Sequence, residues 1–194
     1  MAARGTPTAD AGGGRGIYLA TYVLDDDLKV GCILRQRDPL SSSLPMTRLF
    51  ENILCPIDFD ENSVIAAEMA RDLLQGPDGR LYLLHVMNFP FALTDQEATL
   101  PVSEAKRKLE EIAREHFGGK IRYEILVENS DDTAKAILEA TRRLPPGCIV
   151  MATHGRKGMD RFLLGSVAER ILRESPWPVL TIRPEPQTNA ARNS

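Results

Sequence analysis

The sequence CIVMATHGRKGMDRFLLGS, residues 148–166, decides the fold because it joins a buried strand to a helix through a loop that carries glycines. Residues 148–151 form an unbroken apolar run, which is typical of a strand buried on both faces of a parallel sheet. A helix is predicted from Ser166 to Glu174, and a second apolar run follows at residues 179–182. The stretch therefore predicts a strand–loop–helix–strand unit.

The chain upstream of this stretch repeats the same unit. Apolar runs at residues 53–57 and 81–86, and partial alternation of apolar and polar residues at 121–127, predict three more strands. Segments with helical spacing of apolar residues lie between the strands. A loop is predicted from Asn88 to about Pro101. Alternating strands and helices predict an α/β fold, an open five-stranded parallel sheet with helices on both faces.

Three regions of the chain differ in composition. Residues 1–45 contain a glycine-rich run at 11–16 and two short apolar segments, and two such strands without a helix cannot build a core alone. This N-terminal extension is either a hairpin docked onto the main domain or sequence that precedes a true translation start at Met46. The organised pattern begins after Met46, which favours the second interpretation. Residues 46–184 form the main domain, and the polar tail at 185–194 is predicted to be disordered.

Composition excludes several classes of protein. The 194 residues suit one domain, and a formal net charge of −3 argues against a general nucleic-acid binder, which would be strongly basic. No apolar run is long enough to span a bilayer, and the N-terminus lacks the apolar core of a secretory signal. Three scattered cysteines, Cys32, Cys55 and Cys148, indicate reduced thiols, with Cys55 and Cys148 buried in strands. We therefore expect a cytoplasmic protein without nucleic-acid or membrane partners.

The loop after the fourth strand of the predicted parallel sheet has the features of a phosphate site. Gly155 and Gly165 lack a Cβ, so a phosphate can approach the backbone closely. Ser166 begins a helix, where unpaired N–H groups and the helix dipole favour an anion. Arg156, with Lys157 and Arg161 beside it, supplies positive charge.

Asp58, which follows the first strand of that sheet, is the candidate for the other end of a ligand. Open α/β sheets bind ligands at the carboxyl ends of the strands, where the strand order reverses. If the first and fourth strands are neighbours, Asp58 lies opposite the glycine loop and can accept a hydrogen bond from an adenine amine or a ribose hydroxyl. The alternative is that Asp58 only caps the next helix.

Three motifs together resemble the universal stress protein family. The residues Ala152, Gly155, Gly165 and Ser166 resemble its ATP-binding signature of a small residue, two residues, Gly, nine residues and Gly-Ser. Residues 53–58, with their Pro-x-Asp ending, resemble the family's opening strand, and residues 175–180 resemble its last strand. The resemblance covers about residues 47–184 and implies a Rossmann-like fold of the adenine nucleotide alpha hydrolase type.

The same resemblance implies a stress-response protein that binds ATP, with any Mg²⁺ held mainly by the phosphates. It also implies a homodimer through the last strand, Val179–Ile182, and a further protein partner of unknown identity. The family pattern usually opens with Gly where this chain has Ala152, for which we expect weakened or unaltered binding. The adenosine pocket would be lined by Pro56, Asp58 and Val86, and the ribose and phosphates would be held by Met151, Ala152, Gly155, Gly165, Ser166 and Val167.

Two other functions remain open. A slow ATPase, or a phospho- or nucleotidyl-transfer enzyme, needs a group that positions the acceptor, and Asp58, Asp160 and His154 form no convincing pair. The G-x-x-x-x-G-K-[ST] loop is also missing, and we predict neither catalytic residues nor metal ligands. The second alternative is a protein-binding scaffold that holds no nucleotide.

Overall fold

The computed structural model describes residues 17–25, 28–35, 49–88, 95–119, 121–144, 146–153 and 165–184. The elements in chain order are β1 (Ile17–Asp25), β2 (Leu28–Arg35), β3 (Asn52–Pro56), α1 (Glu61–Leu73), β4 (Arg80–Met87), α2 (Asp95–Phe117), β5 (Arg122–Asn129), α3 (Thr133–Arg143), β6 (Cys148–Ala152), α4 (Ser166–Glu174) and β7 (Val179–Pro184). The predicted tail, residues 185–194, lies outside the described residues.

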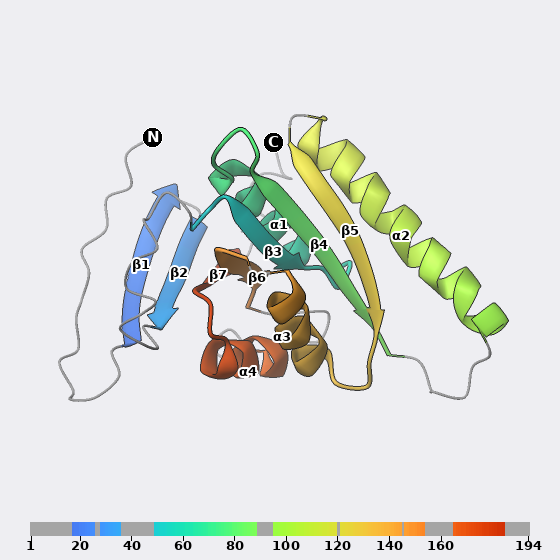
Figure 1. The fold of residues 1–194 in the computed structure, drawn as a ribbon. Helices are drawn as coiled ribbons and strands as arrows, with labels where there is room; N and C mark the ends of the chain where they lie inside the picture. The colour runs from blue at the N-terminus through green and yellow to red at the C-terminus, as the bar shows by residue number, and fades with distance from the viewer. Residues whose placement is uncertain are drawn as a thin grey trace, which may run out of the picture.

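A single sheet joins all the described strands, in the order β1-β2-β7-β6-β3-β4-β5. The strands from β3 to β7 are parallel: β3 pairs with β4 and β6, β4 pairs with β5, and β6 pairs with β7. The predicted α/β class with a five-stranded parallel sheet is confirmed. Figure 1 shows α3 and α4 in front of this sheet and α1 behind it.

Two apolar cores fill the space between the sheet and its helices. The first lies under α1 and α2, where Leu109 and Phe117 of α2 are buried together with alanines of α1. The second lies under α3 and α4, where Ile137 and Ile171 are buried. Cys55 and Cys148 are both buried in the first core, as predicted, and form no disulfide. Burial raises the pKa of Cys55, with a smaller contribution from Cys148.

Helix α1 begins and ends at local signals. Asp60 is its N-cap, and the Asp60 carboxylate accepts a hydrogen bond from the backbone N–H of Asn62 at 2.9 Å. The helix ends at Leu73, and Gly76 follows with a φ of +84°, a conformation that favours glycine. Local capping chemistry therefore sets both ends of this helix.

The predicted loop from Asn88 to about Pro101 is wrong in its second half, because α2 begins at Asp95 and contains Pro101. A proline removes one backbone donor, but a long buried stripe holds this helix on the sheet. The stripe follows an i, i+4 spacing and consists of Ala105, Leu109, Ala113 and Phe117.

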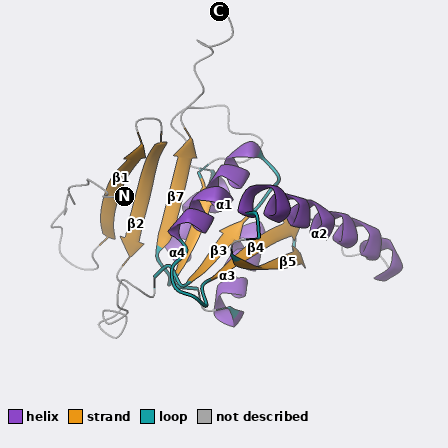
Figure 2. Cartoon of the chain, turned by 90° about the horizontal axis from the view of Figure 1, so that it is seen from above, coloured by secondary structure: helices purple, strands orange, loops and turns teal. Residues whose placement is uncertain are grey.

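Strands β1 and β2 form an antiparallel hairpin that docks onto the main sheet. β2 pairs with β7 from Leu28↔Pro184 to Ile33↔Val179, also antiparallel. Figure 2 shows the three strands side by side. Residues 17–25 and 28–35 are thus arranged as a docked hairpin, which leaves the choice between the two interpretations of residues 1–45 untested. Where translation starts stays a prediction, as does the homodimer through residues 179–182.

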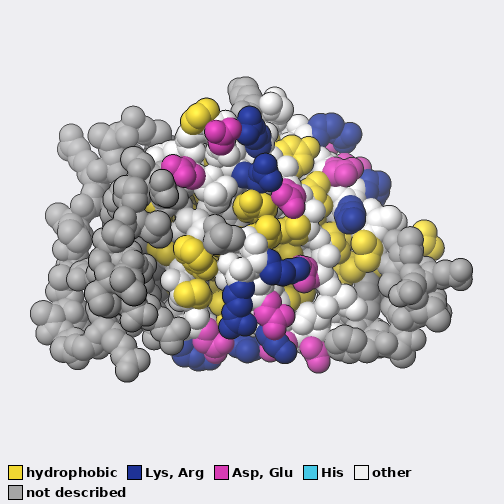
Figure 3. Space-filling model, in the orientation of Figure 1, with side chains coloured by type: hydrophobic (Ala, Val, Ile, Leu, Met, Phe, Trp, Pro, Cys, Tyr) yellow, Lys and Arg dark blue, Asp and Glu magenta, His cyan; other side chains and the backbone are white. Residues whose placement is uncertain are grey.

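The surface carries mixed charge. On the face shown in Figure 3, basic and acidic side chains of the described residues alternate and do not segregate, in keeping with the small net charge of −3. None of the helices in the described ranges is both long and apolar enough to cross a membrane.

Candidate functional site

The strand order reverses between β3 and β6. The chain continues from β3 to β4 and β5 on one side, whereas β6 and β7 lie on the other side of β3. β3 and β6 are direct parallel neighbours, with Ile53 opposite Cys148 and Leu54 opposite Ile149. Their carboxyl ends therefore meet at the position where open α/β sheets bind ligands. The first and fourth strands of the parallel sheet are thus neighbours, which is the condition for Asp58 to lie opposite the glycine loop.

At the end of β6, one hydrogen bond brings together both ends of the glycine-bearing loop. The backbone N–H of Gly165 donates to the carbonyl of Thr153 at 2.8 Å. Thr153 is itself fixed, because its N–H donates to the carbonyl of Ile182 in β7 at 3.0 Å. Residues 154–164, including the predicted Gly155 and Arg156, lie outside the described residues. The loop nevertheless leaves and returns at one point on the carboxyl edge of the sheet.

Gly165 is also the N-cap of α4. The carbonyl of Gly165 accepts the first helical hydrogen bond from Glu169 at 2.9 Å, and no side chain caps the helix start. Asp60 and Asp132 instead cap α1 and α3 with carboxylates. A carboxylate at the start of α4 would occupy the N–H groups that an anion needs, so the glycine keeps this helix start available. Ser166 beside it is exposed.

At the end of β3, a fixed turn holds Asp58. The N–H of Ile57 donates to the carbonyl of Leu84 at 2.8 Å, and the N–H of Asp60 donates to Oδ1 of Asp58 at 3.1 Å. The half-buried Asp58 carboxylate thus stabilises the turn into α1, whereas the cap of that helix is Asp60. Asp58 can hold this turn and still bind a ligand, because a carboxylate has several acceptor positions.

Phe59 is a feature of this turn that the sequence did not predict. Its φ is +65°, which is uncommon for a bulky residue and strains the backbone. Its ring packs against the His85 ring at an interplanar angle of 41°, with 4.3 Å between centroids, and Nζ of Lys108 lies 5.6 Å from the centre of the Phe59 ring. Nδ1 of His85 donates to the carbonyl of Ile57 at 2.7 Å. These contacts hold the strained turn, and nothing in an Asp-Phe-Asp sequence signals a positive φ.

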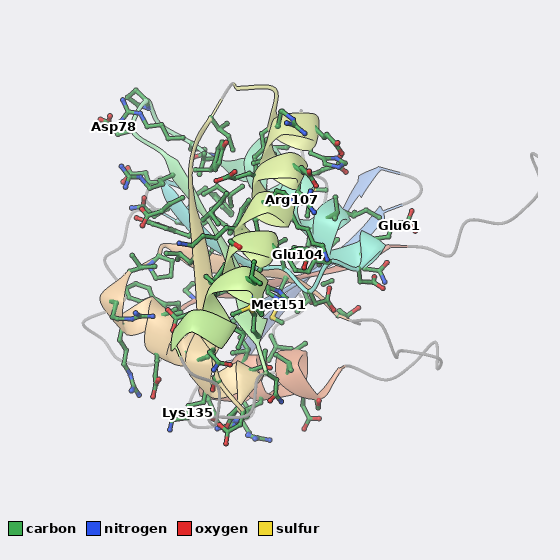
Figure 4. All side chains as sticks on the ribbon, turned by 90° about the vertical axis from the view of Figure 1, so that its right-hand side faces the viewer. Glu61, Asp78, Glu104, Arg107, Lys135 and Met151 are labelled. Carbon is green, nitrogen blue, oxygen red and sulfur yellow. The ribbon has the colours of Figure 1, made fainter. Side chains whose placement is uncertain are left out.

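The predicted apolar site residues fall on the two faces of the sheet. Met151, Val86 and Val167 belong to the core under α3 and α4. Met151 is 5% exposed, and Figure 4 shows it in the interior, while the labelled charged residues lie at the surface. Ala152 packs against the other core, under α1 and α2. The Ala152 methyl, where the family usually has Gly, therefore points away from the face that holds Met151.

The remaining predicted residues gather at the same edge. Pro56 and Asp58 end β3 and are half-buried, and Gly165 and Ser166 begin α4. The described predicted residues thus come from the ends of β3, β4 and β6 and from the start of α4.

Arg170 fixes α4 against α3, a link that the sequence analysis missed. Nη1 of Arg170 lies 2.8 and 2.6 Å from the two carboxylate oxygens of Asp132, the N-cap of α3. The pKa of Asp132 is lowered, first by the hydrogen bond from the backbone N–H of Lys135 and then by Arg170. The same contact raises the pKa of Arg170. A lone Arg and Asp separated by a helix, a strand and a loop give no sequence signal of contact.

Within the described ranges, no three His, Cys, Asp or Glu side chains gather in a way that would hold a metal ion.

Comparison with known proteins agrees with this geometry. The model of the Universal stress protein family matches residues 49–183. The chain is 31% identical over 145 residues to Universal stress protein MJ0531 of Methanocaldococcus jannaschii, covering 70% of this chain and 83% of that protein. It is 28% identical over 161 residues to Universal stress protein MJ0577 of the same organism, covering 71% of this chain and 98% of that protein.

Solved structures share the fold. The structure of MJ0577 superposes with a TM-score of 0.61 at 26% identity and covers 71% of this chain and 99% of that one. At 16% identity, a universal stress protein in complex with cAMP has a TM-score of 0.55, and that of Archaeoglobus fulgidus in complex with dAMP has 0.52; each match covers 70% of this chain and 99% of the other. The family match, the sequence relatives and the strand order agree, and this chain belongs to the universal stress protein family.

Proposed function

We propose that this protein binds ATP at the carboxyl edge of β3 and β6, and that its nucleotide state regulates what it contacts in a stress response. The observation that carries the proposal is the hydrogen bond from Gly165 to Thr153, 2.8 Å long. It places both ends of the glycine-bearing loop and the start of α4 at the point where the strand order reverses.

The phosphates would lie against the start of α4. The first N–H groups of a helix have no partner within the helix, and Gly165 contributes no side chain that competes for them. Ser166 is exposed at the same place and adds a hydroxyl donor. Arg156 would balance the phosphate charge, and Mg²⁺ would be held mainly by the phosphates.

The adenosine would lie toward the end of β3. The Asp58 carboxylate is held there by the N–H of Asp60 at 3.1 Å and can accept from an adenine amine or a ribose hydroxyl. Pro56 and Val86 are half-buried at the ends of neighbouring strands and would supply apolar surface for the base. The cAMP and dAMP complexes of two proteins with this fold support an adenine nucleotide as the ligand class.

The test is calorimetric titration of the purified chain with ATP, ADP, AMP and cAMP. In Gly165→Asp, a carboxylate replaces the open helix start and faces the phosphates. Because opposed like charges cost several kcal/mol, we expect affinity for ATP to fall roughly 100-fold or more.

The matched control is Gly119→Asp, which adds the same charge after α2, at the amino edge of the sheet. Gly119 has a φ of +70° that Asp tolerates better than most residues, and a Cβ built there meets no atom within 4 Å. Gly119→Asp should bind ATP as the unmodified chain does. Equal affinity of the Gly165→Asp variant and the unmodified chain would overturn the phosphate assignment. Tighter binding of AMP or cAMP than of ATP would overturn ATP as the ligand.

A further inference from the structure

Strand β7 has a partner on each side. β6 pairs with it in parallel from Ile149↔Val179 to Ala152↔Ile182, and β2 pairs with it antiparallel from Ile33↔Val179 to Leu28↔Pro184. Without β2, β7 would be the last strand of the parallel sheet and would leave a row of backbone N–H and C=O groups unpaired. Val179, Leu180 and Ile182 are at most 7% exposed, so the uncovered edge would also be apolar. Such an edge is a template for pairing with another chain.

The hairpin is attached to the domain mainly by this one strand. Among the described elements, β2 contacts β1 and β7, and the helices pack on other parts of the sheet. Figures 1 and 2 show β1 and β2 standing beyond the helices. A two-stranded hairpin without a helix over it is marginally stable, and Gly31 inside β2 weakens it further. Separation of β2 from β7 therefore costs far less than removal of a central strand.

We propose that the hairpin β1–β2 is an intramolecular cap that takes the place of a second copy of this chain on the edge of β7. With the cap in place the chain is monomeric. When the hairpin opens, β7 pairs antiparallel with β7 of a second copy, the two-fold arrangement in which identical strands satisfy each other. The homodimer predicted through Val179–Ile182 then requires an open hairpin. This inference does not depend on nucleotide binding.

The outer edge of the hairpin is less suited to a second copy than β7. The register of β1 against β2 shifts between Val23 and Asp25. Such an irregularity twists an edge strand and disrupts a regular ladder, a device by which edge strands avoid pairing. The second copy is therefore assigned to β7.

A cysteine already present in β2 tests the closed state in the full chain. Cys32 lies directly opposite Leu180. Opposite residues of an antiparallel pair have Cα atoms roughly 4.5–5.5 Å apart, within the range of a disulfide. In the Leu180→Cys variant, the thiol introduced at position 180 should therefore form a disulfide with Cys32 of the same chain under mild oxidation, detected by peptide mass mapping.

The matched control is Val179→Cys. Residue 179 is opposite Ile33 and its side chain points to the other face of the sheet, so it should not link to Cys32. A link between two chains in Leu180→Cys, or no preference for position 180 over 179, would overturn the cap.

The second measurement is the mass in solution by analytical ultracentrifugation. The full chain should sediment near 21.5 kDa. The double variant Val30→Pro/Gly31→Pro removes adjacent N–H donors of β2 and should shift the protein to twice that mass. The control Ala2→Pro/Ala3→Pro, which precedes the hairpin, should stay monomeric. A monomeric Val30→Pro/Gly31→Pro variant, or an unmodified chain that is already a dimer, would overturn the proposal. If the proline variant does not fold, the disulfide pattern in the full chain decides.

Discussion

The helices of the two layers differ in the side chains that they bury: α2 of the first layer buries the largest ones, whereas α1 beside it buries only small ones. In the first layer the 23-residue α2 buries Leu109 and Phe117. In the second layer α3 and α4 have 11 and 9 residues and bury mainly small side chains, with one isoleucine each, and Arg170 joins them through Asp132. Helices α1 and α2 of the first layer also have a polar link, because Nδ1 of His116 lies 2.8 Å from Oε1 of Glu68. Burial of a continuous stripe thus holds α2 on the sheet, whereas an accessible ion pair joins α4, and with it the proposed phosphate site, to α3.

The largest effect is expected in the first layer. Leu109→Ala removes a side chain that is 0% exposed, and the resulting cavity should lower the free energy of unfolding by about 2–5 kcal/mol. Leu100→Ala in the same helix is the control, since Leu100 is 77% exposed and should change stability by less than about 0.5 kcal/mol. Both are measured by urea unfolding. Similar losses in the two variants would contradict burial as the force that holds α2.

A smaller effect is expected in the second layer from Asp132→Ala, which removes the cap of α3 and the partner of Arg170. The loss of a helix cap predicts a fall in Tm of roughly 2–4 °C in a domain of this size. Asp132→Asn separates the two roles, because Asn caps a helix nearly as well but carries no charge. An equal fall in Tm for Asp132→Asn and Asp132→Ala would show that the ion pair with Arg170 stabilises the protein and the cap does not. A negligible fall in both variants would refute a stabilising role for Asp132.

The smallest effect is a pH dependence of the same layer. The pKa of Asp132 is lowered in the folded protein, chiefly by the backbone N–H of Lys135 and then by Arg170. Its stabilising contribution is thus fully present above its ordinary pKa of about 3.9 and is lost as pH falls through the lower, folded value.

Thermal unfolding of the unmodified chain and Asp132→Asn between about pH 2 and 6 checks this. The Tm of the unmodified chain should fall more steeply below about pH 4, and salt at about 0.5 M should narrow the difference. Parallel pH curves would show that the charge of Asp132 does not stabilise the fold.

Most of the fold was accessible from the sequence because local signals agree with tertiary burial. The helix at residues 166–174 and the apolar strands coincide with α4 and β3–β7 within a few residues. The start of α2 was missed because Pro101 was interpreted as the end of a loop, although the i, i+4 stripe that follows it decides the helix. Helix α3 has Asp132 as its cap, and the Ser130 hydroxyl just before it is engaged with the backbone of Asp132.

The candidate site could be outlined from the sequence only at positions where the type of residue restricts the role it can have. The glycine and serine at 165–166 and the aspartate after β3 gather at one edge of the sheet, although the aspartate also holds the turn into α1. The strain at Phe59 and the contact of Arg170 with Asp132 depend on φ angles and on distant elements, which no local pattern encodes. The docking of β2 on β7 was only one of two interpretations, because short strands carry no signal of their partner.

The hydrogen bond between Gly165 and Thr153 joins the two residues that flank 154–164, so this segment can be replaced as a unit. Because the two ends are tied to each other and to β7, a change in the length of this segment is not transmitted to the register of β6 or to the start of α4. Each doubling in length of such a loop adds only about 0.6 kcal/mol to the cost of closure. Evolution, or an engineer, is therefore free to lengthen and rewrite this segment for new ligands or partners while the sheet beneath it stays the same.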